Sequence, residues 1–292
     1  SAVSPSTRAV VDGMINSGFT TDLDVAFVRA DEGGTGYTTY GATALTGTVA
    51  HAADALSFAP AEYYLASGKK TKLIGWYPRR TGVSYTQGTR VVDFGEIDGK
   101  TDLMATALQE GSKGAKFSSI TFNHLLTQFS IKVYAPDAAA QGLWGTVSSI
   151  KIAEKKQTCT ITLPAATEAA NTAAAPAFTG NSDLDLVRTN LTTSPVSAIT
   201  YPLTLGVGTA TNAVQAGYAM FAPQATGNVV LKIELSVGGS QTVNVPVPTT
   251  PTTGFLHGSA YEITLKFSSS AITPTVSVVD WIPVTNTPEV EI

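Results

Sequence analysis

Apolar and polar residues alternate with a period of two through much of this chain. Between Val229 and Val237 every second residue is apolar and the residues between them are mostly polar. Successive side chains of a strand point to opposite faces of a sheet, so this pattern predicts a half-buried β-strand with Val237 on its inner face. Gly238 and Gly239 come next, and alternation resumes from Thr242 to Val247. The two segments therefore predict a β-hairpin.

The same alternation predicts further strands in both halves of the chain, whereas helical periodicity is almost absent. These segments are DLDVAFVRA (22–30), KLIGWYP (72–78), TRVVDFGEI (89–97), FSIKVYAP (129–136) and AYEITLKFS (260–268). Many short strands joined by Gly, Pro and Asn turns are typical of β-sandwiches. The fold class predicted from the sequence is all-β, with two antiparallel sandwich domains.

The length of 292 residues also favours two domains of ordinary size. Small residues and turn formers fill 135–145, and we place the boundary there, with an N-terminal domain at 1–140 and a C-terminal domain at 141–292. The segment 110–116 is an alternative boundary. The Ala-rich segment from Pro164 to Gly180 is predicted to be a surface excursion.

Composition excludes some classes of function. Hydrophobic residues make up 43% of the chain and charged residues 14%, and the net charge is −4. No run of Lys or Arg exceeds two residues, so no nucleic-acid partner is expected. No apolar run approaches the roughly 20 residues of a membrane span. The start of the sequence has no apolar signal-peptide region, so we expect a mature or trimmed form.

Residue types that carry catalysis or bind metals are sparse. The lone cysteine, Cys159, alternates with apolar residues and is expected in a core. His124 lies among apolar residues and is interpreted as packed and hydrogen-bonded, while His257 lies between glycines in a turn. The chain has three histidines, His51, His124 and His257, and their spacing is not that of a metal site. We therefore predict no catalytic residue, no cofactor and no metal, and no enzymatic activity.

Two segments leave alternatives open. Glu96, Asp98 and Asp102 suggest a calcium loop, but an Asp-Gly turn at Asp98 explains that segment without metal. Trp76 and Tyr77, followed by two arginines, are candidates for stacking on a sugar, or else belong to a core and its rim.

The order of several short segments resembles the fimbrillin-like family, the pilin subunits of type V pili. The resemblance is carried by STRAVVDG near the start, KLIGWYP, DGKTDLM, ITFNHLLTQFSIKV, GYAMFAPQ, HGSAYEITLKF and the closing TVSVVDW. It implies two transthyretin-like, immunoglobulin-like sandwiches, a lipoprotein precursor anchored at the outer membrane, export through that membrane, and polymerisation with other pilin subunits at the cell surface. It also implies cleavage after an N-terminal arginine, here Arg8, which removes a first strand and opens a groove.

The stretch PTVSVVDWIPV near the C-terminus is a candidate donor strand for such a groove in a neighbouring subunit. It has β-branched residues and enough length, with Val276 and Val278 on one face and Val279 and Trp281 on the other. A strand added from a neighbour would pair the backbone of the groove and fill its side-chain pockets. The alternative is that this stretch pairs permanently within its own C-terminal domain.

The function predicted from the sequence is therefore a structural pilin subunit, of the shaft or of the tip, that polymerises by donor-strand addition. The alternative is a surface-anchored adhesin or glycan-binding lipoprotein on the same fold, which would bind host or microbial receptors or glycans near Trp76 and Tyr77.

Overall fold

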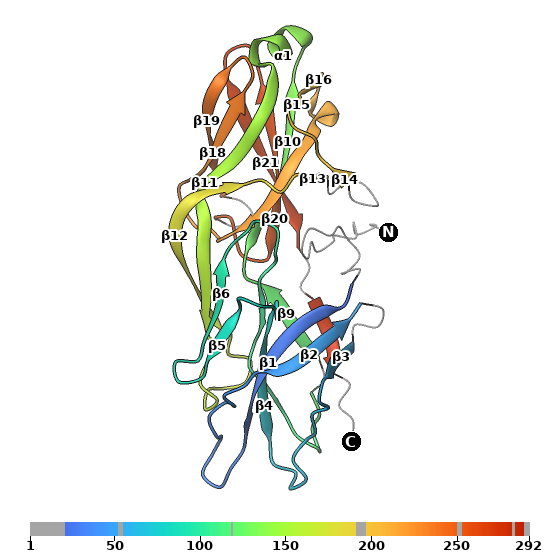
Figure 1. Cartoon of the computed structure of the whole chain (residues 1–292), viewed down its shortest axis with the longest axis vertical. Coiled ribbons are helices and arrows are strands. Elements are labelled where there is room, and N and C mark those ends of the chain that lie inside the picture. Colours follow the sequence, from blue (N-terminus) through green and yellow to red (C-terminus); the bar gives the residue numbers. More distant parts are fainter. Residues whose placement is uncertain are drawn as a thin grey trace.

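The longest strand of the molecule, β11 (Thr146–Thr162), runs along the long axis and joins the two ends of an elongated chain (Figure 1). The structure is a computed structural model that describes residues 21–51, 55–117, 119–190, 197–249, 253–281 and 284–288. One part of β11 pairs with β18 (Asn228–Leu235), and its far end pairs with β6 (Val91–Glu96). A single strand thus takes part in the packing of both halves.

Short strands make up nearly all of the remaining regular structure. In the first half they are β1 (Leu23–Asp31), β2 (Leu45–Ala50), β3 (Ala55–Phe58), β4 (Thr71–Tyr77), β5 (Ser84–Thr86), β7 (Met104–Thr106), β8 (Gln109–Gly111), β9 (Ile120–His124) and β10 (Thr127–Ala135). In the second half they are β12 (Ala175–Asp185), β13 (Thr189–Asn190), β14 (Ser197–Ala198), β15 (Leu203–Thr204), β16 (Gly206–Val207), β17 (Val214–Phe221), β19 (Gly239–Pro246), β20 (Ser259–Phe267), β21 (Ile272–Asp280) and β22 (Val284–Pro288). The helices among the described residues are α1 (Ala138–Trp144) and a 3-10 turn (Ala210–Asn212).

Three main sheets organise these strands. The N-terminal sheet has the order β1-β2-β3-β22-β9-β7-β4-β8, and β1 also pairs with β4. A second sheet, β16-β10-β20-β21 with β17 beside β10, faces a third, β19-β18-β11-β6-β5 with β12 and β15 beside β11. The second sheet and the β19-β18-β11 part of the third enclose one core, so this end of the molecule is a sandwich.

The N-terminal sheet buries residues on both of its faces. Val25 and Phe27 of β1 belong to a core enclosed by β1 to β4, β7 and β9. Ala26 and Val28, the residues that alternate with them, belong to a different core shared with β6 and β11. Because the side-chain period of a strand is two, one strand serves both cores. This explains why β4 is buried along its whole length.

A buried cation holds the loop after β11 against the N-terminal sheet. The ammonium group of Lys72 on β4 donates hydrogen bonds to the carbonyl oxygens of Ala166 at 3.0 Å and Glu168 at 2.6 Å. Both acceptors lie on the loop between β11 and β12. Buried charges are retained where they are paired or hydrogen-bonded, so this lysine fixes that loop against the N-terminal sheet.

The all-β prediction is confirmed. The predicted hairpin of β18 and β19 is confirmed as well, with Asn228 opposite Pro246 at one end and Leu235 opposite Gly239 at the turn. The placement of Val237 on the inner face was wrong, because it lies in the hairpin turn and is 65% exposed. The Ala-rich segment is a loop only up to residue 174, since β12 begins at Ala175.

Strand pairing does not divide at the expected boundary after residue 140. β10 precedes that boundary and pairs with β17 and β20, which follow it. The early strand β6 pairs with β11. How the chain divides into domains stays a prediction.

Gly75 on β4 packs directly against a core ring. A Cβ atom at this position would lie 2.5 Å from Cε1 of Phe27. We expect Gly75→Ala to lower the free energy of unfolding by about 1–3 kcal/mol, because the ring must leave its packed position. Gly88→Ala is the matched control, since no heavy atom lies within 4 Å of its added Cβ. Urea unfolding of both variants is the measurement, and equal midpoints would contradict this packing.

Candidate functional site

The C-terminal segment that the sequence marked as a donor strand is divided between two sheets. Residues 272–280 form β21, which pairs antiparallel with β20 along its whole length. Ile272 lies opposite Phe267 at one end, and Asp280 lies opposite Ser259 at the other. The chain then leaves this sheet and enters the N-terminal sheet as β22 (Figure 1). The stretch PTVSVVDWIPV thus ends one strand and begins another, and its role as a donor strand stays a prediction.

The valines of β21 differ in burial. Val276 is half-buried and packs against the core of the C-terminal sandwich. Val278 and Val279 are 46% and 42% exposed, so neither fills a pocket of its own subunit. Their strand lies at the end of its sheet, with β20 as its partner among the described strands. An edge strand with exposed valines can accept further pairing.

Trp281 follows β21 and is only 4% exposed. Its ring stacks on His124 of β9, with ring centroids 4.1 Å apart and an angle of 22° between the planes. This contact packs the C-terminal segment against the N-terminal core.

His124 is held from its other side by a buried carboxylate. Nδ1 of His124 lies 2.6 Å from Oδ2 of Asp102, and both side chains are fully buried. Removal from water raises the pKa of the Asp102 carboxyl above its usual range, while His124 acts in the opposite direction. The interpretation of His124 as a packed, hydrogen-bonded residue is confirmed, since its ring lies between Asp102 and the ring of Trp281.

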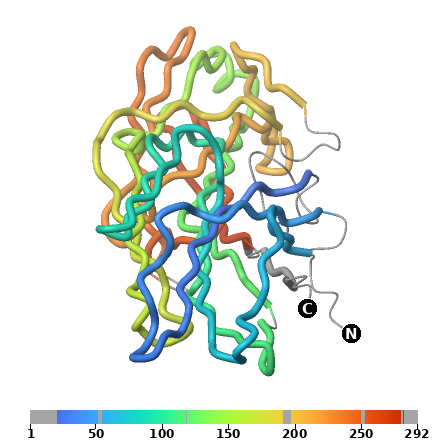
Figure 2. Tube along the Cα trace, turned by 60° about the horizontal axis from the view of Figure 1, so that its bottom comes forward, coloured from blue at the N-terminus to red at the C-terminus, as the bar shows by residue number. Residues whose placement is uncertain are grey.

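β22 lies between β3 and β9. Val284, Thr285 and Asn286 pair antiparallel with Phe122, Thr121 and Ile120 of β9. Thr287 and Pro288 pair parallel with Ala55 and Leu56 of β3. We call the space between the facing edges of these two strands the β3–β9 slot. In Figure 2 the red C-terminal segment accordingly runs beside the blue and cyan N-terminal strands.

The other predicted site residues are not brought together. Arg8 lies outside the described residues, so its cleavage stays a prediction. Trp76 and Tyr77 are both buried, and the Trp76 ring packs against Tyr85 with centroids 5.7 Å apart. The interpretation of Trp76 and Tyr77 as ligand-facing aromatics is thereby corrected. The reason is that β4 is covered on both faces.

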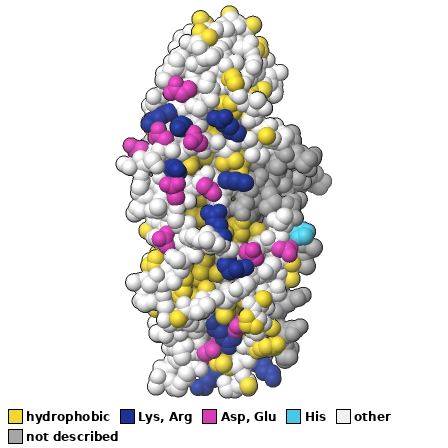
Figure 3. All heavy atoms as spheres, viewed as in Figure 1, with side chains coloured by type: hydrophobic (Ala, Val, Ile, Leu, Met, Phe, Trp, Pro, Cys, Tyr) yellow, Lys and Arg dark blue, Asp and Glu magenta, His cyan; other side chains and the backbone are white. Residues whose placement is uncertain are grey.

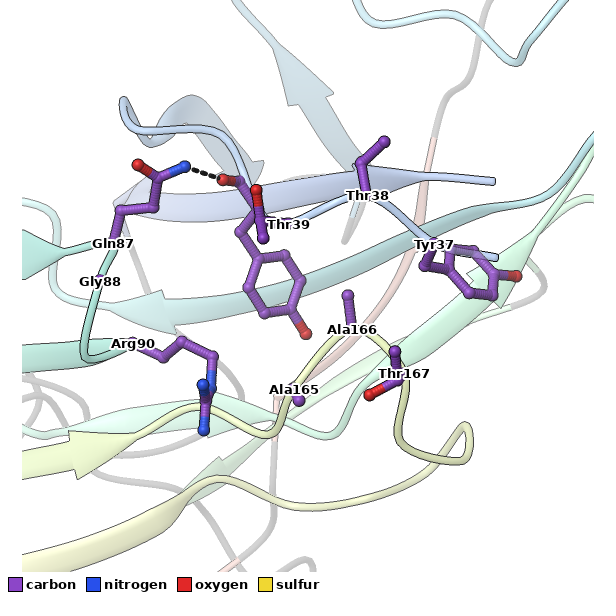
Figure 4. A pocket seen from close by; sticks show the side chains of 10 residues that line it. Tyr37, Thr38, Thr39, Gln87, Gly88, Arg90, Ala165, Ala166 and Thr167 are labelled. Atoms are coloured by element: carbon purple, nitrogen blue, oxygen red, sulfur yellow. Dashed lines mark hydrogen bonds between the residues drawn. The ribbon is translucent and has the colours of Figure 1, made fainter. Parts of the chain in front are cut away.

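A cavity of about 370 Å³ lies elsewhere, at the meeting point of three segments (Figure 4). Its walls come from 37–40 after β1, from the β5–β6 turn, and from 165–167 in the loop after β11. Tyr37 and Thr38 line one side and Arg90 another. Sequence analysis missed this cavity because the segments are far apart in the chain and share no motif.

Hydrogen bonds fix the walls of this cavity. Gln87 donates through Nε2 to the carbonyl oxygen of Tyr40. Arg90, at a left-handed φ of 57°, donates through Nε to the carbonyl oxygen of Leu163 at 3.1 Å. The Tyr37 hydroxyl donates a hydrogen bond to Glu110 at 2.7 Å. The pKa of Tyr37 is raised above its usual range, mainly by burial and to a smaller extent by this hydrogen bond. The site can offer hydroxyl groups and a guanidinium to a polar ligand.

The remaining chemical groups have structural environments. Asp98 accepts hydrogen bonds from the backbone of Lys100 and Thr101, and Gly99 has a φ of 76°, as an Asp-Gly turn requires. Cys159 is buried, which raises the pKa of its thiol to about 12. Within the described ranges, no group of three or more His, Cys, Asp or Glu side chains could hold a metal ion.

On the face shown in Figure 3, basic and acidic side chains lie next to one another.

A family model described as fimbrillin-like matches residues 7–281. The chain belongs to the fimbrillin-like family. No curated protein matches it in sequence. In the part of the chain that the structure describes, no helix is long and apolar enough to cross a membrane.

Solved structures with the same fold accompany this family match. A candidate cell adhesion protein of Bacteroides uniformis is 18% identical with a TM-score of 0.60, over 91% of this chain and 94% of that one. A candidate cell adhesion protein of Bacteroides ovatus is 16% identical with a TM-score of 0.54, over 94% and 95% of the two chains. At these identities the likeness establishes the fold alone.

The stacked indole of Trp281 should stabilise the molecule far more than the neighbouring exposed valines do. We expect Trp281→Ala to lower the free energy of unfolding by about 3–5 kcal/mol, because the change leaves a cavity beside His124. Val278→Ala is the control and should change it by less than about 0.5 kcal/mol, because that side chain is exposed. Chemical denaturation measures both. A small loss for Trp281→Ala would contradict the packing of the indole.

Proposed function

We propose that this protein is a structural subunit of a cell-surface fimbria that polymerises by donor-strand addition. Family membership supports the fimbrial role. The observation that carries the assembly mechanism is the position of β22, a C-terminal strand that completes the N-terminal sheet of its own chain. A segment that fits this sheet within one subunit has the backbone pattern to fit the same sheet of a neighbour.

Several finer features belong to this proposal. The subunit folds as two transthyretin-like sandwiches and is made as a lipoprotein precursor that crosses the outer membrane. Cleavage after Arg8 removes an N-terminal strand and frees the groove for the incoming one. The neighbour's segment from Val276 onward then supplies the donor strand.

The exposed valines of β21 allow assembly to be tested apart from folding. We expect the double variant Val278→Asp, Val279→Asp to keep a thermal midpoint close to that of the wild-type monomer, because these residues are 46% and 42% exposed and water can reach the added charges. Fimbriae on cells expressing the full-length precursor should be lost, because charge at these positions cannot enter an apolar groove. Negative-stain electron microscopy counts the fimbriae.

Val237→Asp is the matched control, since that valine is exposed in a turn of the same half of the chain. It should assemble as the wild type does. Normal fimbriae on cells carrying the double variant would refute a donor role for these valines.

A second candidate function is a surface adhesin that binds a glycan, and the cavity beside Tyr37 supports it. The guanidinium of Arg90 hydrogen-bonds through Nε. Its two terminal nitrogens have no hydrogen-bond partner among the described residues, so they are available to sugar hydroxyl or carboxylate groups.

A glycan array tests this adhesin function. Arg90→Ala should reduce binding to the glycans that the wild type captures by at least about tenfold, the equivalent of one strong hydrogen bond. Arg79→Ala is the control, because Arg79 pairs with Asp24 away from the cavity. An array on which the wild type binds no glycan would overturn the adhesin function.

A further inference from the structure

The cavity beside Tyr37 holds a positive charge that lacks a carboxylate partner within the described residues. Arg90 is the one charged side chain among the described residues that line this cavity (Figure 4). Several basic side chains elsewhere are paired with carboxylates, as Arg29 is with Glu62 at 2.8 Å. The guanidinium of Arg90 forms its hydrogen bond with a backbone carbonyl instead. A ligand that carries a carboxylate would supply the missing partner.

The charged groups that contact Tyr37 from outside the cavity balance one another. The ammonium group of Lys72 lies 4.2 Å from the centroid of the Tyr37 ring and 3.8 Å from the Glu110 carboxylate. Lys70 pairs with the same carboxylate at 2.6 Å, and its backbone N–H donates to Glu32 at 2.8 Å. Two cations and two carboxylates add no net charge beside this wall. Arg90 therefore remains the uncompensated charge at the cavity.

The guanidinium of Arg90 is held in position before any ligand binds. The backbone N–H of Leu163 donates to the carbonyl oxygen of Arg90 at 2.8 Å, and Nε of Arg90 donates back to the Leu163 carbonyl at 3.1 Å. Arg90 also has a left-handed φ of 57°, which is uncommon outside glycine and is frequent at ligand sites. These contacts leave Nη1 and Nη2, the nitrogens that bind a carboxylate side by side. A group fixed in advance loses less conformational entropy on binding.

The other polar groups of the cavity suit a sugar. Thr38, Thr39 and Thr167 are exposed, and their hydroxyl groups can both donate and accept hydrogen bonds, as sugar hydroxyls do. Gln87 uses Nε2 to hold the carbonyl of Tyr40, which leaves its Oε1 as an acceptor. The volume of about 370 Å³ is at the small end of ligand pockets, which span roughly 300–1,000 Å³. It suits one sugar residue better than an extended peptide.

We propose that the cavity beside Tyr37 binds a carboxylated sugar of the uronic acid type, with its carboxylate on Nη1 and Nη2 of Arg90 and its ring hydroxyls on the threonines. This inference rests on the adhesin function proposed above and narrows its ligand to one chemical class. A planar guanidinium forms two parallel hydrogen bonds with a carboxylate, which a single neutral hydroxyl group cannot match. The carboxylate therefore provides most of the selectivity.

Two ligands that differ in one group test this proposal on the wild-type protein. The probes are methyl β-glucuronide and its neutral amide, methyl β-glucuronamide. Each is titrated into the full chain and followed by saturation-transfer NMR. We expect the glucuronide to bind at least about tenfold more tightly than the amide, because the amide lacks the charge and the second acceptor oxygen. Equal affinity, or no binding of the glucuronide, would overturn the proposal.

Arg90→Asn removes the guanidinium and keeps a residue type that tolerates a left-handed φ. Its affinity for methyl β-glucuronide should fall at least about tenfold, while its affinity for the amide should change little. Arg90→Lys keeps the charge without the planar pair of donors, so its affinity should lie between those of Arg90→Asn and the wild type.

Arg79→Asn is the charge-matched control, because Arg79 pairs with Asp24 away from the cavity. It should bind the glucuronide as the wild type does. A folded Arg90→Asn protein with wild-type affinity for the glucuronide would overturn the proposal. Where Arg90→Asn lowers the thermal midpoint, the comparison of the two ligands on the wild type decides.

Three more probes separate the carboxylated sugar from other anions. They are a sulfated methyl glucoside, acetate, and acetyl-dialanine with a free carboxylate. Each should bind at least about tenfold more weakly than methyl β-glucuronide, because each lacks either the planar carboxylate or the ring hydroxyls. Equal affinity for the sulfated sugar or for acetate would assign the site to anions in general. Equal affinity for the peptide would assign it to a peptide carboxylate, and any of these results would overturn the proposal.

The glycan array separates this inference from the adhesin function. A wild type that captures neutral glycans but no glycans containing uronic acids would refute the carboxylated ligand and leave the adhesin function standing. A wild type that binds methyl β-glucuronide in solution but captures no glycan on the array would refute the adhesin function and leave the carboxylate site standing.

Discussion

Each strand edge in a sheet needs a partner for its backbone N–H and C=O groups, and this need determines where the C-terminal segment lies. The edges of β3 and β9 face each other in the N-terminal sheet without direct pairing, and β22 satisfies both. The core inside the ring is covered at the same place, next to Phe122 and Leu56. One short strand therefore supplies both hydrogen bonds and core coverage, which is why its position has consequences for the whole N-terminal half.

Segments from the two halves of the chain are held together by contacts of different chemistry. β11 extends from one core to the other by backbone pairing. Lys72 holds the loop after β11 through carbonyl oxygens, and Trp281 packs on His124 through its ring. Backbone pairing, a buried cation and an aromatic stack thus all fix segments from the second half of the chain against the N-terminal sheet or its core.

The same geometry connects stability to function. In the C-terminal segment, Trp281 is buried whereas Val278 and Val279 are exposed. The part of the segment that stabilises the free subunit is thus distinct from the part that is available to a neighbour. The proposed strand addition would use backbone groups that any sheet offers, so its specificity would have to come from register and from side chains along the edge.

The period-two alternation determined the strands, the hairpin of β18 and β19, and the burial of Cys159, because these depend on neighbours within a few residues. Alternation could not reveal that β22 is a separate strand in the N-terminal sheet, since five residues carry too little pattern to name a partner. It also could not decide between core and surface for Trp76, because burial on both faces of β4 comes from strands elsewhere in the chain. The cavity beside Tyr37 and the contact of His124 with Asp102 and Trp281 join residues from distant segments. Local sequence determined which residues form strands, and tertiary structure decided which edges meet, because edge pairing depends on the closure of long loops rather than on the residues within a strand.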